Sequence, residues 1–284
     1  MILLDFSGTI FSCIMGNLFH NDENVLDEEA IRKSILNQIR KYNQKFKKTY
    51  GPLVICCDGK NCWRKDIFPY YKCKRRETQA ASQFNFVEIF HYIDKIKEEL
   101  KDYFYFIEVE GAEADDVIAA IIMKDNLQFN HGNMLVISRD KDLKQLQKFD
   151  GVFQYNPIDD GGRFEVCNNP SDFLLEQIII GDNVDSIPNI FSDANSFALH
   201  KRQKPATRKR IDAIKEARDN IPSELKERFE LNQKLICLEF IPGNLIASIL
   251  EQFDIDINKK RKNLLSYFAR YSLMDLAANI RDFN

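Results

Sequence analysis

Residues 111–122 read GAEADDVIAAII, and this stretch decides how the rest of the chain is interpreted. It places Glu113, Asp115 and Asp116 within four residues, at the start of an apolar segment that is typical of a buried helix. One or two acids are common at such a position, because the helix dipole favours negative charge at the N-terminus. Three acids directly before a buried helix exceed that role, so we interpret them as part of a functional site.

The same association of apolar runs with acids recurs along the chain. Acids follow the runs MILL, LVICC and LVIS and a helix that ends near residue 180; they are Asp5, Asp58, Asp140, Asp142, Asp182 and Asp185. Such runs are typical of buried parallel strands, which gather the loops at their carboxyl ends into one crevice. The sequence therefore predicts an α/β fold with a central, mostly parallel twisted sheet flanked by helices.

A cleft that holds nine carboxylates needs compensating charge, because like charges a few ångströms apart repel strongly. Divalent metal is the simplest source of that charge, so we expect a Mg²⁺-dependent enzyme that works on phosphates. Each motif alone has a simpler explanation, since Asp142 suits a helix N-cap and GDNVD suits a turn. Independent turns give no reason for acids after every run.

The remaining periodicity predicts an α/β body followed by helices, with a boundary near residue 185. Strands are expected at residues 1–5, 53–57, 104–109 and 134–137, and an edge strand at 152–155. The segment FSGTIFS (6–12) is expected as a turn. Helices are expected at 27–50, 85–102, 114–123, 142–147 and 170–180, and later at 205–220, 222–240, 242–253 and 259–271.

Bases concentrate in two stretches apart from the acids. Residues 63–76 (WRKDIFPYYKCKRR) mix aromatic rings with Lys and Arg, which suits single-stranded nucleic acid because bases stack on rings and cations contact phosphates. Residues 200–210 (HKRQKPATRKR) contain no acid and lead into a helix start, which suits a phosphate anchor. A solvated basic loop is the alternative for both. The candidate nucleic-acid-binding residues are Arg64, Tyr71, Lys74, Arg76, Lys201, Arg202, Lys204, Arg208 and Lys209.

The composition indicates the cellular compartment more clearly than the function. The 284 residues, 44% of them hydrophobic, suffice for one large domain or two smaller ones, and a net charge of −3 indicates no partner. Seven cysteines, two of them adjacent, indicate small buried hydrophobes in a reducing compartment. No apolar run approaches the roughly 18 residues of a membrane span, and no leader precedes the first strand. We expect a cytoplasmic monomer without membrane contact.

The motifs LLDFS, ICCDGK, WRKDIFPYYKCKR, EADDVIA, SRDKDL and GDNVDS, in this order, resemble the 5′ nucleases of the flap endonuclease family, most of all its ribonuclease H members (5′→3′ exonucleases) from T-even bacteriophages. The resemblance covers nearly the whole chain. It implies a nuclease (PIN-like) domain at residues 1–185, which includes a helical arch at 59–86, and a helical DNA-binding subdomain at 186–284. The sequence departs from the family after Asp185, where the usual Gly-rich helix–turn–helix segment is missing.

The resemblance also implies a two-ion mechanism. Two Mg²⁺ ions, which Mn²⁺ can replace, would support in-line attack of water on a phosphodiester. The first ion would bind Asp58, Glu113, Asp115 and Asp140, with Asp5 and Asp116 nearby; the second would bind Asp142, Asp182 and Asp185. Asp115 and Asp140 would be catalytic through the metal. Lys72 and Arg75 match the YKxxR positions of the arch and would act on the scissile phosphate, while Tyr71 would stack on a base.

The substrates implied are DNA and RNA–DNA hybrids with 5′ ends or flaps, including RNA primers, during phage DNA replication in the host cytoplasm. A single-strand-binding protein and a sliding clamp are the implied partners. The main alternative is a haloacid dehalogenase-like phosphatase with Asp5 as nucleophile, although Ser7 replaces the second Asp of that motif. A PIN-type ribonuclease and a non-catalytic DNA-binding protein are the others.

Overall fold

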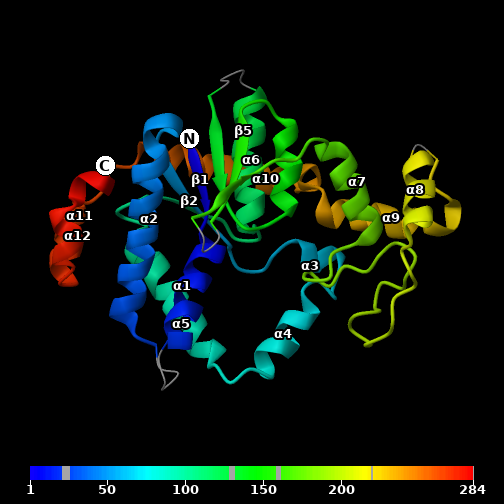
Figure 1. Ribbon diagram of the computed structural model, residues 1–284, viewed down its shortest axis with the longest axis horizontal. Helices are drawn as coiled ribbons and strands as arrows, with labels where there is room; N and C mark the ends of the chain where they lie inside the picture. The colour runs from blue at the N-terminus through cyan, green and yellow to red at the C-terminus, as the bar shows by residue number, and fades with distance from the viewer. Residues whose placement is uncertain (21–25, 128–131, 158–160, 219, 284) are drawn as a thin grey trace.

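A six-stranded sheet forms the centre of the computed structural model, which describes residues 1–20, 26–127, 132–157, 161–218 and 220–283 (Figure 1). The strand order is β3-β2-β1-β4-β5-β6. The strands are β1 (Ile2–Asp5), β2 (Leu53–Cys57), β3 (Tyr105–Glu108), β4 (Met134–Ile137), β5 (Val152–Asn156) and β6 (Arg163–Glu165). Neighbouring strands are parallel except for the antiparallel pair β5 and β6. The prediction of a mostly parallel sheet flanked by helices is confirmed.

The helices and helical turns of the described residues are α1 (Phe6–His20), α2 (Glu28–Tyr50), α3 (Arg64–Ile67), α4 (Cys73–Ala80), α5 (Phe86–Leu100), α6 (Ala114–Leu127), η1 (Asp142–Lys148), α7 (Pro170–Ile180), α8 (Arg208–Glu216), α9 (Ser223–Ile236), η2 (Leu238–Phe240), α10 (Gly243–Asn258), α11 (Leu264–Arg270), α12 (Met274–Ala278) and η3 (Ile280–Phe283). Within the described ranges, no helix combines the length and the hydrophobicity that a bilayer span needs.

The central strands are apolar throughout because helices cover both faces of the sheet. Leu3 and Val54 face one way, into a core shared with α6 and α10. Leu4 and Ile55 face the other way, into a core shared with α1, α2 and α5. Helices therefore cover both faces of the sheet, and a functional site is left to form at the carboxyl ends of the strands.

Two expectations about local structure were wrong. Residues 6–12 form the first turns of α1, because Phe6, Ile10 and Ile14 recur at helical spacing and are all buried. Gly8 hides this pattern in the sequence, yet its N–H bonds to the Asp5 carboxylate at 3.2 Å and so starts the helix. The strand β5 is not at the edge, because β6 pairs with it. A three-residue strand is too short to leave a periodic signal.

The arch (residues 59–86) contains α3 and α4 and leads away from the sheet before α5 returns to it (Figure 1). Its first part is packed rather than solvated, since Phe68 and Tyr71 lie in a cluster with Ile187 and Phe229. This cluster joins the arch to the C-terminal part of the chain.

The C-terminal helices also pack on the body. Leu245 and Ile249 of α10 share the core of α6, and Tyr267 and Phe268 of α11 join the core under α2 and α5. A division of the chain near residue 185 stays a prediction.

Candidate active site

The acids that follow β1, β2 and β4 meet at one edge of the sheet. In the register of the strands, Leu4 lies beside Ile55 of β2 and Ile137 of β4, so the chain leaves all three strands at the same level. Asp5 ends β1, Asp58 follows β2 and Asp140 follows β4. The Asp58 carboxylate accepts the N–H of Ala114 at 2.8 Å, which ties the start of α6 and its acids to the same place.

Asp5, Asp115 and Asp140 form a first group of interacting carboxylates. Burial, and after it the charges of Asp58 and Asp140, raise the pKa of Asp5 to about 6, although Ser138 Oγ donates to it at 2.7 Å. Burial and the charges of Asp140 and Asp5 raise the pKa of Asp115 well above its usual range. Burial also raises the pKa of Asp140. The charge of Lys72 opposes the rise in pKa at Asp115 and Asp140 but does not cancel it.

Asp142, Asp182 and Asp185 form a second group of carboxylates, next to Asp140. Burial raises the pKa of Asp142 to about 8, with further contributions from Asp140 and Asp182. Its Oδ1 atom is buried and has no hydrogen-bond partner among the described residues. Asp182 differs: burial opposes its ionisation, but Lys141 Nζ at 2.8 Å and two backbone N–H groups lower its pKa.

This donor set fits hard divalent cations. Carboxylate oxygens are the ligands that such ions take, and an orphaned buried oxygen beside mutually repelling acids is what a bound cation would relieve. As the side chains stand, no group of three His, Cys, Asp or Glu side chains in the described ranges is placed to hold an ion. Rotation of side chains would be needed to complete coordination.

The structure corrects the roles expected for Arg64 and Asp116. Arg64 is only 3% exposed, and its guanidinium contacts Asp116 at 2.8 Å and Glu113 at 3.1 Å. Asp116 is fully buried, and its Oδ2 also accepts from Trp63 Nε1 and from the N–H of Glu113. Arg64 therefore cannot contact nucleic acid, and both oxygens of Asp116 are occupied, so neither prediction holds. The pair holds the arch and Glu113 in place.

Tyr71 is a second correction. Its ring is 2% exposed, and its hydroxyl lies 2.8 Å from Glu113 Oε2 and 2.9 Å from Asp185 Oδ2. A buried ring cannot stack on a nucleobase. Its hydroxyl instead bridges Glu113 and Asp185.

Lys72 contacts the same two acids, and Arg75 contacts one of them. Lys72 Nζ lies 2.5 Å from Glu113 Oε1 and 3.7 Å from Asp185 Oδ1, and Arg75 Nη2 lies 2.9 Å from Asp185 Oδ1. Lys72 adopts a left-handed backbone conformation (φ 56°), and its N–H bonds to the Asp185 carbonyl at 2.8 Å. The arch is thus docked on the carboxylates through its cations.

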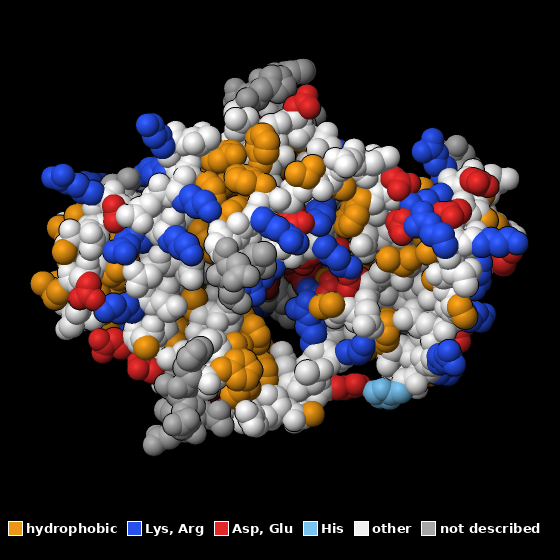
Figure 2. Space-filling model, in the orientation of Figure 1, with side chains coloured by type: hydrophobic (Ala, Val, Ile, Leu, Met, Phe, Trp, Pro, Cys, Tyr) orange, Lys and Arg blue, Asp and Glu red, His pale blue; other side chains and the backbone are white. Residues whose placement is uncertain are grey.

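The other basic candidates lie at the surface. Figure 2 shows acidic side chains inside a hollow that Lys and Arg side chains surround. Lys74 donates to Asn183 at 2.9 Å, and Arg76 is exposed. Arg208 is engaged by Glu176 and Asp212, each at 2.9 Å. The basic candidates of the second stretch are all exposed; they are Lys201, Arg202, Lys204, Arg208 and Lys209.

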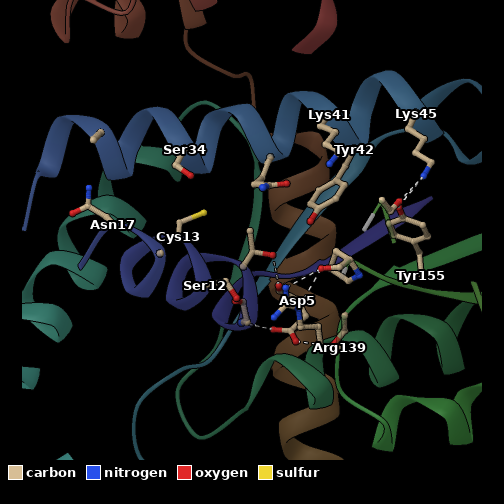
Figure 3. Close-up of a pocket in the computed structure, with 18 residues that line it drawn as sticks. Asp5, Ser12, Cys13, Asn17, Ser34, Lys41, Tyr42, Lys45, Arg139 and Tyr155 are labelled. Carbon is tan, nitrogen blue, oxygen red and sulfur yellow. Dashed lines mark hydrogen bonds between the residues drawn. The ribbon is translucent and has the colours of Figure 1, made fainter. Parts of the chain in front are cut away.

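Sequence reasoning missed Ser138 and Lys141. Both lie within VISRDKD, where only the acids were weighed, and they bond to Asp5 and Asp182. It also missed two hollows beside the carboxylates. One of about 240 Å³ is lined by Asp58, Lys72, Arg75 and Arg76, and one of about 470 Å³ lies between α1 and α2 and reaches Asp5 (Figure 3).

Known proteins share both parts of this chain. Residues 1–169 match the family described as 5'-3' exonuclease, N-terminal resolvase-like domain, and residues 170–283 match the family described as T4 RNase H, C terminal. The chain is 29% identical to the ribonuclease H of Enterobacteria phage T4. The alignment is 294 residues long and covers 99% of this chain and 95% of that protein.

Two solved structures share the fold. The T5 D15 protein co-crystallised with metal ions has a TM-score of 0.60 at 18% identity and covers 90% of this chain and 98% of its own. The bacteriophage T5 D15 flap endonuclease, in a pseudo-enzyme-product complex with DNA and metal ions, has a TM-score of 0.62 at 18% identity and covers 91% and 99%.

Proposed function

The chain belongs to the 5'-3' exonuclease family with an N-terminal resolvase-like domain, and from this premise we propose that it is a 5′ nuclease that hydrolyses phosphodiesters at 5′ ends and flaps with two Mg²⁺ ions. Divalent-metal dependence and DNA as substrate have the support of the T5 structures, which contain metal ions and, in one case, DNA. The observation that carries the proposal is the convergence of buried carboxylates, which raise one another's pKa, at the carboxyl ends of β1, β2 and β4.

The carboxylates divide into two sets. Asp58, Glu113, Asp115 and Asp140, with Asp5 beside them, would hold one ion; Asp142, Asp182 and Asp185 would hold the other, partly through waters. Mg²⁺ bound there supplies a water of lowered pKa and neutralises charge on the leaving oxygen. Asp116 is excluded from the first set because it is fully buried and Arg64 donates to both of its carboxylate oxygens.

Lys72 and Arg75 are the proposed catalytic cations of the arch. Each already contacts a proposed metal ligand, Glu113 or Asp185, so each lies within a side chain's reach of the reacting phosphate. Released from these acids, their charge would stabilise the negative charge that develops on the phosphoryl oxygens. Lys74, Arg76 and the exposed bases of residues 200–210 would hold the phosphates of the bound substrate.

A 5′-labelled flap substrate tests the function. The wild-type chain should release short 5′ products in Mg²⁺ and none in EDTA. Asp115→Asn or Asp140→Asn should lower cleavage by at least about 10²-fold while DNA binding is kept, because the loss of negative charge reduces repulsion of phosphate. The matched control is Asp150→Asn, an exposed acid away from the site.

Other outcomes would separate the alternatives. Release of inorganic phosphate from small monoesters, lost in Asp5→Asn, would indicate the phosphatase. DNA binding without any cleavage would indicate a non-catalytic protein. Activity on RNA–DNA hybrids, and partnership with a single-strand-binding protein or a sliding clamp, stay predictions.

A further inference from the structure

The hollow between α1 and α2 has no role in the site described above. It has a volume of about 470 Å³, and side chains of both helices point into it (Figure 3). One end reaches Asp5, the carboxylate that ends β1. The hollow beside the arch shares none of its lining residues and contains Asp58 instead. The carboxylates therefore lie between two separate depressions.

The charge of this α1–α2 groove is positive apart from Asp5. Its cations are Lys41 and Lys45 of α2 and Arg139 of the loop after β4. Lys41 and Lys45 are four residues apart, so both lie on the same face of α2, and both are exposed. Among the described residues that line the groove, Asp5 is the single acid. Such a surface attracts a polyanion toward the carboxylates.

Two of the three cations are held in place. Lys45 Nζ donates to Tyr155 Oη at 2.7 Å, and Arg139 donates from Nε and Nη2 to the Pro157 carbonyl at 3.2 and 3.0 Å. Lys41 has no recorded hydrogen bond or ion pair with a described residue, so its ammonium group is available to a ligand. Pre-positioned cations bind phosphate with little ordering cost.

Neutral hydrogen-bonding groups make up part of the rest of the wall, beside the rings of Tyr42 and Tyr155 and the side chain of Cys13. Ser12 of α1 and Ser34 and Gln38 of α2 line the groove between the cations and its far end. Hydroxyl and amide groups of this kind contact phosphate and sugar oxygens in nucleic-acid complexes. Together with the three cations, these groups suit the wall to a sugar–phosphate backbone.

We propose that the α1–α2 groove binds the sugar–phosphate backbone of the substrate strand next to the scissile phosphate, on the other side of α1 from the arch. The proposal rests on the proposed function and names a further part of its substrate site. In Figure 1, α1 lies between α2 and the arch helix α4. A strand cut at the carboxylates would run from the arch, past Asp5, into the groove, where Lys41 and Lys45 neutralise two of its phosphates.

Salt-dependent binding tests the proposal. Affinity for a nicked duplex with a 5′ flap is measured by fluorescence anisotropy in Ca²⁺ over a range of salt. Lys41→Ala/Lys45→Ala should raise the Kd on the order of tenfold and reduce the slope of log affinity against log salt by about 2, because each lost phosphate contact removes about one unit. Lys48→Ala, an exposed lysine of the same helix outside the groove, is the control.

A second arm locates the contact on the substrate. Single methylphosphonate linkages, which are neutral, should weaken wild-type binding at one or two positions beside the cleavage point and should have no effect there in the double variant. Lys41→Ala alone should give about half the change in salt slope. Because Lys41 bonds to no described residue, this variant keeps the test valid even if Lys45→Ala disturbs Tyr155.

Several results would contradict the proposal that the groove binds the substrate strand. The first is a salt slope and affinity of the double variant that match those of Lys48→Ala. The second is an equal methylphosphonate effect in wild type and variant. The third is Lys41-dependent binding of inorganic phosphate without any change for DNA, which would indicate a site for a free anion. If wild-type protein neither bound nor cut the substrate, the proposed function itself would fail.

Discussion

At the scale of a single residue, Asp142 shows how strongly the metal-free site disfavours a negative charge on a carboxyl group. Its pKa is raised to about 8, first by burial and then by Asp140 and Asp182, and one of its oxygens has no partner in the described structure. An unfolded aspartate has a pKa of about 4. Between these two pH values the folded chain binds more protons than the unfolded chain, so stability falls as pH rises.

Asp142→Asn should therefore stabilise the metal-free protein in alkaline solution. We expect a thermal midpoint above that of the wild type at pH 8 in EDTA, and a difference that shrinks as pH falls through 4, below which the wild-type carboxyl is protonated in both states. Calorimetry at pH 5 and pH 8 measures it. An equal shift at both pH values would mean that charge is not the cause.

The removal of Lys72 should lower the rate of phosphodiester cleavage. Lys72→Ala should lower turnover by about 10²–10³-fold, because a cation next to Glu113 and Asp185 is lost from the place where phosphate charge develops. Single-turnover cleavage of the flap substrate measures it. Lys260→Ala, an exposed lysine of the C-terminal part, is the control. Near-normal turnover would remove Lys72 from the catalytic group.

At the scale of elements, the start of the arch is fastened to α6. Arg64 of α3 joins Asp116 of α6 and also donates to the Leu235 carbonyl of α9 at 2.8 Å, so three elements meet at one buried guanidinium. The sequence predicted an exposed nucleic-acid contact here, because a basic aromatic stretch does not show which of its cations is buried. Only packing against α6 and α9 decides that.

Asp116→Ala should destabilise the fold by about 3–5 kcal/mol, because Arg64 would stay buried without its main partner. Urea unfolding measures the change. Arg208→Ala, which removes exposed ion pairs with Glu176 and Asp212, should change stability by no more than about 1 kcal/mol. If Asp116→Ala were as mild as Arg208→Ala, the pair would not hold the arch in place.

Regular elements with strong periodicity were predicted well. The strands at 53–57 and 134–137 and the helix at 170–180 have the predicted bounds. The helix α1 was missed because Gly8 and its polar neighbours interrupt the apolar pattern, and β6 because it is too short. These failures arise where tertiary contacts, not local sequence, decide the structure.

For the whole molecule, the sequence was sufficient to predict that acids from five segments share one edge of a parallel sheet. It was not sufficient to separate ligands from supports. Asp116 and Tyr71 occur in the same motifs as Asp115 and Lys72, yet burial gives them structural roles. The groove between α1 and α2 could not be predicted either, because its lysines belong to an ordinary amphipathic helix and gain significance only beside Asp5.

The central claim is that these acids jointly bind two divalent cations, and a crystal structure of the protein soaked in Mn²⁺ tests it most directly through the anomalous signal of the metal. The account predicts two ions, one bound by Asp58, Glu113, Asp115 and Asp140 and one by Asp142, Asp182 and Asp185. A map without manganese at these carboxylates under saturating conditions would contradict it.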